Sequence, residues 1–195
     1  IAEALAPGLR QLAGGEPVTL AGFSFGGIVC GLIAQQGRVP IRAVVLVGAA
    51  GLGLQREPMD LRAWRNLVTP EARREAHRAN VATLMIWDKA KIDPLAVHLQ
   101  QQNAERARFR SRRIARTSLL RTALEATNVP LAGIWGEYDA TAAPYVEERR
   151  ELLQRLRPGA PFEVIPGAGH WVQYEAPDRF NATLLRMLEE VKPRA

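Results

Sequence analysis

The sequence predicts an α/β protein with a mainly parallel sheet, and two observations support this class. Short β-branched or apolar runs alternate with segments of helical periodicity, and glycine-rich turns separate them. The run Ile41–Val47 is apolar almost throughout, which is typical of a parallel strand covered on both faces. The chain has 195 residues, which is enough for one domain with a good core and an insertion.

Residues 1–54 are predicted to form the first part of this sheet. Leu5, Leu9 and Leu12 recur at helical spacing, and Gly14 begins a stretch that stops the helix. The predicted elements are a helix over 1–13, a strand over 17–21, a helix over 25–36 and a strand over 41–47.

Residues 55–125 differ in character from the rest of the chain. They contain no convincing strand, and they hold fifteen Lys or Arg against eight Asp or Glu, whereas the whole chain has a net charge of +6. Helices are predicted near 60–67, 70–87, 95–107 and 111–125. We interpret this segment as a helical cap inserted into the α/β core.

The α/β alternation resumes in residues 126–195, which are predicted to complete the core. The elements expected are a strand over 129–136, a helix over 144–156, a strand over 161–166 and a last helix that begins at Pro177. The apolar stripe of that last helix is expected to comprise Phe180, Leu184, Leu185 and Leu188.

The most informative stretch follows the first predicted strand, where Gly22-x-Ser24-x-Gly26 leads directly into a helix. This is the pattern of a nucleophile elbow, a sharp turn that exposes a serine hydroxyl at the edge of a sheet. Glycines on either side avoid a Cβ clash at the strained turn. The Phe25 amide would then lie at a helix N-terminus, where it can donate to an oxyanion.

An elbow of this kind needs an acid and a histidine, in that order, further along the chain. Asp139 lies three residues beyond the strand predicted to end at Gly136, and His170 lies in a glycine-flanked loop after the next strand. Both would reach the same sheet edge as Ser24, so we predict a Ser-His-Asp triad. Glu137 lies nearby and competes with Asp139 for the role of the acid. The position of Asp139 relative to the strand end favours Asp139.

The composition indicates which kinds of partner and which cellular compartment are expected for the protein. Cys30 is the one cysteine, so an intramolecular disulfide is excluded, and no apolar run is long enough to span a membrane. Aromatic residues make up only 6% of the chain and no nucleic-acid motif is found, so nucleic acid is not an expected partner. His77 and His98 lack ligand partners at metal-binding spacing, and no metal site is predicted. We predict a cytoplasmic protein and leave a homo-oligomer open.

The basic segment has two interpretations, a solvated helical face or a surface that attracts an anionic substrate. Within the arginine run over 106–116, Arg110 and Arg113 are candidates to reach a substrate carboxylate. Phe23 and Trp171 are candidate pocket residues, because they adjoin the predicted nucleophile and base. Packing in the core, or between the cap and the core, is the commoner role of such side chains.

Taken together, these motifs resemble the α/β-hydrolase fold superfamily, and the resemblance covers nearly the whole chain. The matching motifs are Gly22-Phe23-Ser24-Phe25-Gly26-Gly27, Gly136-Glu137-Tyr138-Asp139 and Gly167-Ala168-Gly169-His170-Trp171. The resemblance implies that the four predicted strands are the fifth to eighth of the family. Its four earlier strands and its oxyanion loop have no counterpart here, so an N-terminally truncated chain is expected and a second oxyanion donor cannot be named.

The resemblance implies a serine hydrolase that needs no cofactor and acts on an ester, a thioester or a lactone. The basic cap and the Gly-His-Trp pattern also resemble hydrolases that cleave carbon–carbon bonds in acidic ring-fission products, where cap arginines bind a carboxylate. The alternative is a relative that binds small molecules without catalysis, or an inactive remnant of the same fold.

Overall fold

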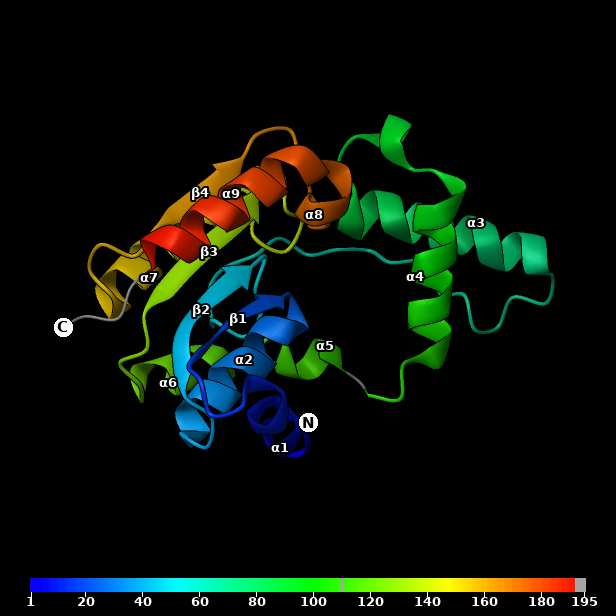
Figure 1. The fold of residues 1–195 in the computed structure, drawn as a ribbon. Helices are drawn as coiled ribbons and strands as arrows, with labels where there is room; N and C mark the ends of the chain where they lie inside the picture. The colour runs from blue at the N-terminus through cyan, green and yellow to red at the C-terminus, as the bar shows by residue number, and fades with distance from the viewer. Residues whose placement is uncertain (110, 192–195) are drawn as a thin grey trace.

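The computed structural model describes residues 1–109 and 111–191, and its centre is a parallel sheet of four strands (Figure 1). The strands pair in the order of the sequence. They are β1 (Val18–Phe23), β2 (Ile41–Val47), β3 (Leu131–Gly136) and β4 (Phe162–Ile165). The sheet confirms the predicted α/β class, and each strand lies close to its predicted limits.

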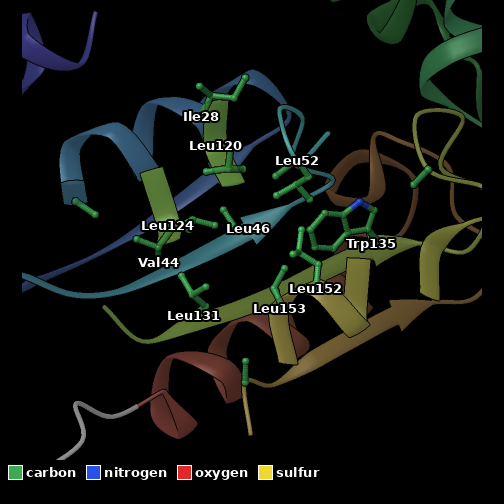
Figure 2. Close-up of a cluster of buried hydrophobic side chains, with 14 of the residues drawn as sticks. Ile28, Val44, Leu46, Leu52, Leu120, Leu124, Leu131, Trp135, Leu152 and Leu153 are labelled. Carbon is green, nitrogen blue, oxygen red and sulfur yellow. The ribbon is translucent and has the colours of Figure 1, made fainter. Parts of the chain in front are cut away.

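One face of the sheet is covered by three helices, because alternate side chains of the buried strands are apolar. Val44 and Leu46 of β2 share an apolar cluster with Ile28, Leu120 and Leu152 (Figure 2). The helices that supply these last three residues are α2 (Phe25–Gln36), α6 (Leu119–Glu125) and α7 (Val146–Leu156). α1 (Ala2–Ala13) packs in turn on α2 and ends, as α2 does, at a left-handed glycine.

The opposite face is covered by the C-terminal helices α8 (Val172–Glu175) and α9 (Pro177–Glu190). Met187 of α9 is completely buried in one cluster with Val45 and Ile134. Pro177 occupies the first position of α9, as predicted. The sheet therefore lies between two layers of helices.

The predicted apolar stripe of α9 is partly wrong. Phe180 and Leu184 do pack against the sheet, but Leu185 is 64% exposed and Leu188 is 40% exposed. The buried position in that turn is Met187. Residues at 180, 184 and 187 share one helical face, whereas position 188 lies about 70° and position 185 about 130° around the helix from it.

The chain between β2 and β3 is mainly helical. Its elements are α3 (Pro70–Asn80), a π-helical turn over Val81–Met85, a 3₁₀ turn over Lys89–Lys91, α4 (Pro94–Arg106), α5 (Ser111–Ile114) and α6. Proline follows a capping side chain at the start of both α3 and α4, where Thr69 and Asp93 accept hydrogen bonds from backbone amides. Figure 1 shows α3 and α4 standing beyond the sheet, whereas α6 lies beside α2.

Two predictions for this segment are wrong in detail. Residues 60–67 form no helix, and the Asn80 side chain instead bonds the backbone N–H and C=O of Arg62, at 2.8 and 3.0 Å. The helix expected over 111–125 is broken between α5 and α6.

The domain limits 1–54, 55–125 and 126–195 stay a prediction. No helix in the described ranges is long and apolar enough to cross a membrane.

Beyond the sheet, the packing around α3 includes a buried histidine. His77 is 0% exposed, and its ring lies 4.9 Å from the ring of Trp64. Within the described residues neither ring nitrogen has a hydrogen-bond partner. Burial lowers the pKa of His77 from 6.5, and the carboxylate of Glu105 opposes this effect.

This histidine predicts a loss of stability in mild acid. Because the folded state disfavours the charged imidazole, its contribution is complete above pH 6.5 and declines as the pH falls below that value. Each unit of lowered pKa corresponds to about 1.4 kcal/mol. We expect His77→Phe to reduce the difference in unfolding free energy between pH 7.5 and pH 5.5, measured by urea titration. His98→Phe, at an exposed position, is the control; an equal effect of both variants would contradict the prediction.

Candidate active site

Ser24 occupies a sharp turn between β1 and α2. Its φ of 50° and ψ of −114° make it the one non-glycine residue of the described chain with a positive φ. Backbone hydrogen bonds hold the turn: the Ser24 amide donates to the carbonyl of Val47 at 2.9 Å, and the Ala50 amide donates to the carbonyl of Ser24 at 3.1 Å. The strain is therefore supported by the neighbouring strand β2 and the loop after it.

Small residues at this turn are required by close backbone contacts, although not at every predicted position. A Cβ on Gly22 would lie 2.7 Å from backbone atoms of Gly26 and Gly27, and a Cβ on Gly27 would lie 2.6 Å from that of Ala49. A Cβ on Gly26 would meet nothing within 4 Å. The expectation of a clash at Gly26 is wrong, and Gly27 has the steric role instead.

Asp139 follows β3 and is completely buried. One of its carboxylate oxygens, Oδ1, accepts hydrogen bonds from the backbone amide and the hydroxyl of Thr141, at 2.8 and 2.7 Å. The competing acid Glu137 is exposed, and its carboxylate accepts a hydrogen bond from the Gly167 amide. Asp139 is thus the carboxylate held in a fixed orientation toward the site.

His170 lies in the loop after β4 and links the other two residues. Its Nδ1 is 2.9 Å from both carboxylate oxygens of Asp139, and its Nε2 is 3.0 Å from Oγ of Ser24. With Nδ1–H donating to Asp139, Nε2 is free to accept the serine proton; this tautomer follows from the hydrogen-bond partners. The imidazole is 3% exposed and lies 4.8 Å from the ring of Phe23.

Ser24 and His170 open into a cavity of about 370 Å³. This volume is in the range of small-molecule sites. Phe25, the first residue of α2, also lines the cavity, and its amide makes no hydrogen bond within the described part of the chain. The helical segment contributes apolar and amide side chains to the wall, namely Met59, Leu61, Leu84, Met85, Gln100 and Asn103.

Most of the predicted pocket residues do not line this cavity. Phe23 packs against the ring of His170, and Trp171 is buried in an apolar cluster with Ile86. Arg113 is exposed on α5. Arg110 lies outside the described residues. The cavity is lined instead by four other arginines, Arg56, Arg112, Arg116 and Arg149.

These arginines make the cavity positive. No Asp or Glu is found among the described lining residues. Burial, and then the adjacent charge of Arg116, lower the pKa of Arg56. Burial also lowers the pKa of Arg149, whose guanidinium donates to the carbonyls of Gln55, Thr141 and Tyr145.

The arginine run over 106–116 contains Arg112 and Arg116, although other members of the run were the predicted candidates, and the other two lining arginines lie outside it. Arg149 occurs on the apolar stripe of α7 with Val146, Leu152 and Leu153, where a charged residue is unusual. Arg56 lies in an irregular loop with no pattern to single it out. No group of three or more His, Cys, Asp or Glu side chains suited to a metal ion is found in the described ranges.

In α/β-fold serine hydrolases, a serine on a strand-to-helix turn is hydrogen-bonded to a histidine, and the histidine is hydrogen-bonded to an acid from another loop of the parallel sheet; this chain has the same arrangement. The chain belongs to the Alpha/beta hydrolase family, which its residues 1–183 match. No curated protein sequence matches it. The expected fold family and the expectation of a hydrolase are therefore confirmed.

Several solved structures share this fold. A meta-cleavage product hydrolase from Pseudomonas fluorescens IP01 is similar at a TM-score of 0.69 and 20% identity, over 97% of this chain and 72% of that one. A serine hydrolase involved in carbazole degradation has a TM-score of 0.66 and 21% identity, over 97% of this chain and 71% of that one. An esterase from Thermogutta terrifontis has a TM-score of 0.60 and 22% identity, over 98% of this chain and 73% of that one. At these identities the likeness concerns the fold.

The site predicts a specific sensitivity at Gly48, which has a φ of 50°. A Cβ there would lie 2.9 Å from Oδ2 of Asp139 and 3.2 Å from Nδ1 of His170. We expect Gly48→Ala to lower hydrolytic activity at least tenfold, because the methyl group would separate the acid from the histidine. Turnover of a p-nitrophenyl ester would measure this.

Gly37→Ala is the matched control for this substitution. Gly37 has a φ of 63°, and a Cβ there would meet nothing within 4 Å. Both variants should lose about 1–2 kcal/mol of stability from left-handed strain. If Gly48→Ala lost no more activity than Gly37→Ala, the steric argument would be wrong.

Proposed function

We propose that the protein is a serine hydrolase that cleaves a small carbonyl substrate through an acyl-enzyme intermediate. The observation that carries this proposal is the continuous series of hydrogen bonds from Asp139 through His170 to Ser24, which ends at the wall of the cavity. Esters, thioesters and lactones all present the carbonyl carbon that a serine nucleophile attacks.

In the proposed acylation, Nε2 of His170 accepts the hydroxyl proton as Oγ of Ser24 bonds to the carbonyl carbon. The carbonyl oxygen becomes an oxyanion, and the Phe25 amide donates a hydrogen bond to it. His170 then gives its proton to the leaving group as the bond to that group breaks. Asp139 keeps the imidazole in the required tautomer and stabilises its positive form.

In the proposed deacylation, a water molecule replaces the leaving group. His170 removes a proton from this water as its oxygen attacks the acyl carbon, and the proton then returns to Oγ of Ser24 as the acid product departs. The proposed chemistry uses side chains, the Phe25 backbone amide and water, so no cofactor is proposed.

The segment 55–125 is proposed to act as a cap over this site. Leu84, Met85 and Gln100 come from it and line the same cavity as Ser24. The cavity wall is therefore divided between the helical segment and the sheet edge. A wall of this kind limits substrate size and excludes water from the reacting atoms.

The substrate is proposed to carry a carboxylate or another anionic group. Arg56 and Arg116 line the cavity close to each other, and within the described residues neither forms an ion pair. Arg56 is partly desolvated and is repelled by the adjacent charge of the exposed Arg116, so an anion between the two guanidinium groups would stabilise both. Besides an ester, thioester or lactone, an acidic ring-fission product with a cleavable carbon–carbon bond is a second candidate substrate. The basic cavity and the meta-cleavage product hydrolase among the similar structures favour it.

The proposed nucleophile predicts covalent labelling at one serine. A fluorophosphonate probe should modify the protein, and Ser24→Ala should abolish the modification and lower hydrolysis by at least a thousandfold. Ser111→Ala, at another serine in the cavity wall, is the control for labelling specificity. A folded protein that is not labelled would support the non-catalytic binding alternative, and labelling that persists in Ser24→Ala would contradict Ser24 as the nucleophile.

The proposed anion site predicts a selective change in KM. Arg116→Gln should raise the KM for p-nitrophenyl succinate about tenfold, because a charge-assisted contact of about 1.5–3 kcal/mol is lost. The KM for the neutral acetate ester should stay within twofold. Arg74→Gln, exposed on α3, is the control. Equal effects on both esters would contradict an anionic substrate.

A further inference from the structure

A buried carboxylate outside the proposed triad connects the helical segment to the histidine loop. Glu175 is 3% exposed, and its side chain accepts hydrogen bonds from three backbone amides. Oε2 accepts from Gly169 at 2.7 Å and from Trp87 at 3.1 Å, and Oε1 accepts from Asp88 at 2.7 Å. One donor is therefore the neighbour of His170, and the other two lie more than 80 residues away in the chain.

The segment 85–88, here called the strap, lies directly against the histidine loop. The amide of Trp171 donates to the carbonyl of Met85 at 2.7 Å. A Cβ on Gly169 would lie 2.8 Å from the backbone nitrogen of Trp87, so no side chain fits between the two segments. The residues on both sides of His170 are thus tied either to Glu175 or to the strap.

Further contacts extend this connection along α8. The side chain of Lys91 donates to the backbone carbonyl of Glu175 at 2.9 Å, and the hydroxyl of Tyr174 donates to Asp93 at 2.7 Å. The ring of Trp87 stacks on Tyr138, the residue before Asp139, at 4.2 Å. The strap therefore contacts both loops that carry the proposed acid and base.

We propose that Glu175 is a positioning residue that holds the strap and the histidine loop as one unit, so that the helical segment sets the place of His170. This inference rests on the proposed function, because it assigns the consequence to His170 as the base. The imidazole must satisfy Asp139 at 2.9 Å and Ser24 at 3.0 Å together, and these partners come from different loops. A displacement of about 1 Å is enough to cost about a hundredfold in rate.

The substitution Glu175→Gln tests the role with little change in volume. A carboxylate accepts on both oxygens, whereas a glutamine presents one oxygen and an NH₂ group that only donates. At least one of the three backbone amides would then face a donor and lose its partner. The strap and the histidine loop should separate, and the proton transfer from Ser24 should slow.

The first experiment compares Glu175→Gln with Glu163→Gln in the whole protein. Glu163 is an equally charged residue on β4 whose carboxylate pairs with Arg186 at an exposed position. We expect Glu175→Gln to lower kcat for p-nitrophenyl acetate, and the rate of fluorophosphonate labelling, at least tenfold, with KM within threefold. Glu163→Gln should stay within twofold of wild type. A folded Glu175→Gln with unchanged labelling and kcat would overturn the proposal, as would a loss confined to KM.

A second pair of variants removes the contact from the strap side, in case Glu175→Gln does not fold. Asp88 has a φ of −76°, which suits proline, and Asp88→Pro removes the amide that donates to Oε1. Asp88→Ala is the matched control, because it keeps that amide. Both variants lose the Asp88 carboxylate that accepts a hydrogen bond from the Ala90 amide in the following turn. We expect a threefold to tenfold slower labelling for Asp88→Pro than for Asp88→Ala; equal rates would contradict the proposal.

Hydrogen exchange separates this proposal from the proposed function. Amides of residues 85–87 and 167–171 should exchange faster together in Glu175→Gln and in Asp88→Pro, and not in the controls. Faster exchange in one segment alone would overturn the coupling. A wild-type protein that is not labelled at Ser24 would instead overturn the proposed function, and the exchange result would still decide whether Glu175 joins the two segments.

Discussion

The site depends on the register of four parallel strands. Phe23 pairs with Val47, Val47 pairs with Ile134, and Gly136 pairs with Ile165, so β1 to β4 end along one edge of the sheet. Backbone bonds continue the ladder past the strand ends, as in the contact of the Gly48 amide with the carbonyl of Ile134 at 2.9 Å. Each loop therefore starts from a fixed point, and side chains 146 residues apart in sequence can come within hydrogen-bond distance.

Close packing of backbone on backbone then leaves little freedom to the loops themselves. A Cβ on Gly136 would lie 2.2 Å from the carbonyl oxygen of Gly169 and 2.4 Å from that of Ala168. The loop with the acid therefore passes directly over the loop with the histidine, and only glycine permits this approach. The small residues around the site are explained by these contacts between loops, in addition to the turn at Ser24.

The sheet and the residues Ser24, Asp139 and His170 could be predicted from the sequence because both follow from short-range patterns. Continuous apolar runs, strand ends and glycine-flanked loops are visible in single segments. The cavity wall was not predictable in this way. Arg56 and Arg149 come from a loop and a helix on opposite sides of β3 in the sequence, and only their packing brings them to one cavity. Glu175 is similar, since its partners Trp87 and Asp88 lie in a distant segment.

The net charge of the helical segment is a poor guide to this cavity. Most of its described arginines are exposed, and these include Arg112 and Arg116, which line the cavity, as well as Arg113, which does not. An exposed charge is screened by salt within about 10 Å, whereas a partly buried one keeps most of its field. The half-buried Arg56 and the buried Arg149 therefore contribute most to the potential inside the cavity, and the exposed arginines contribute mainly to the long-range attraction of an anion.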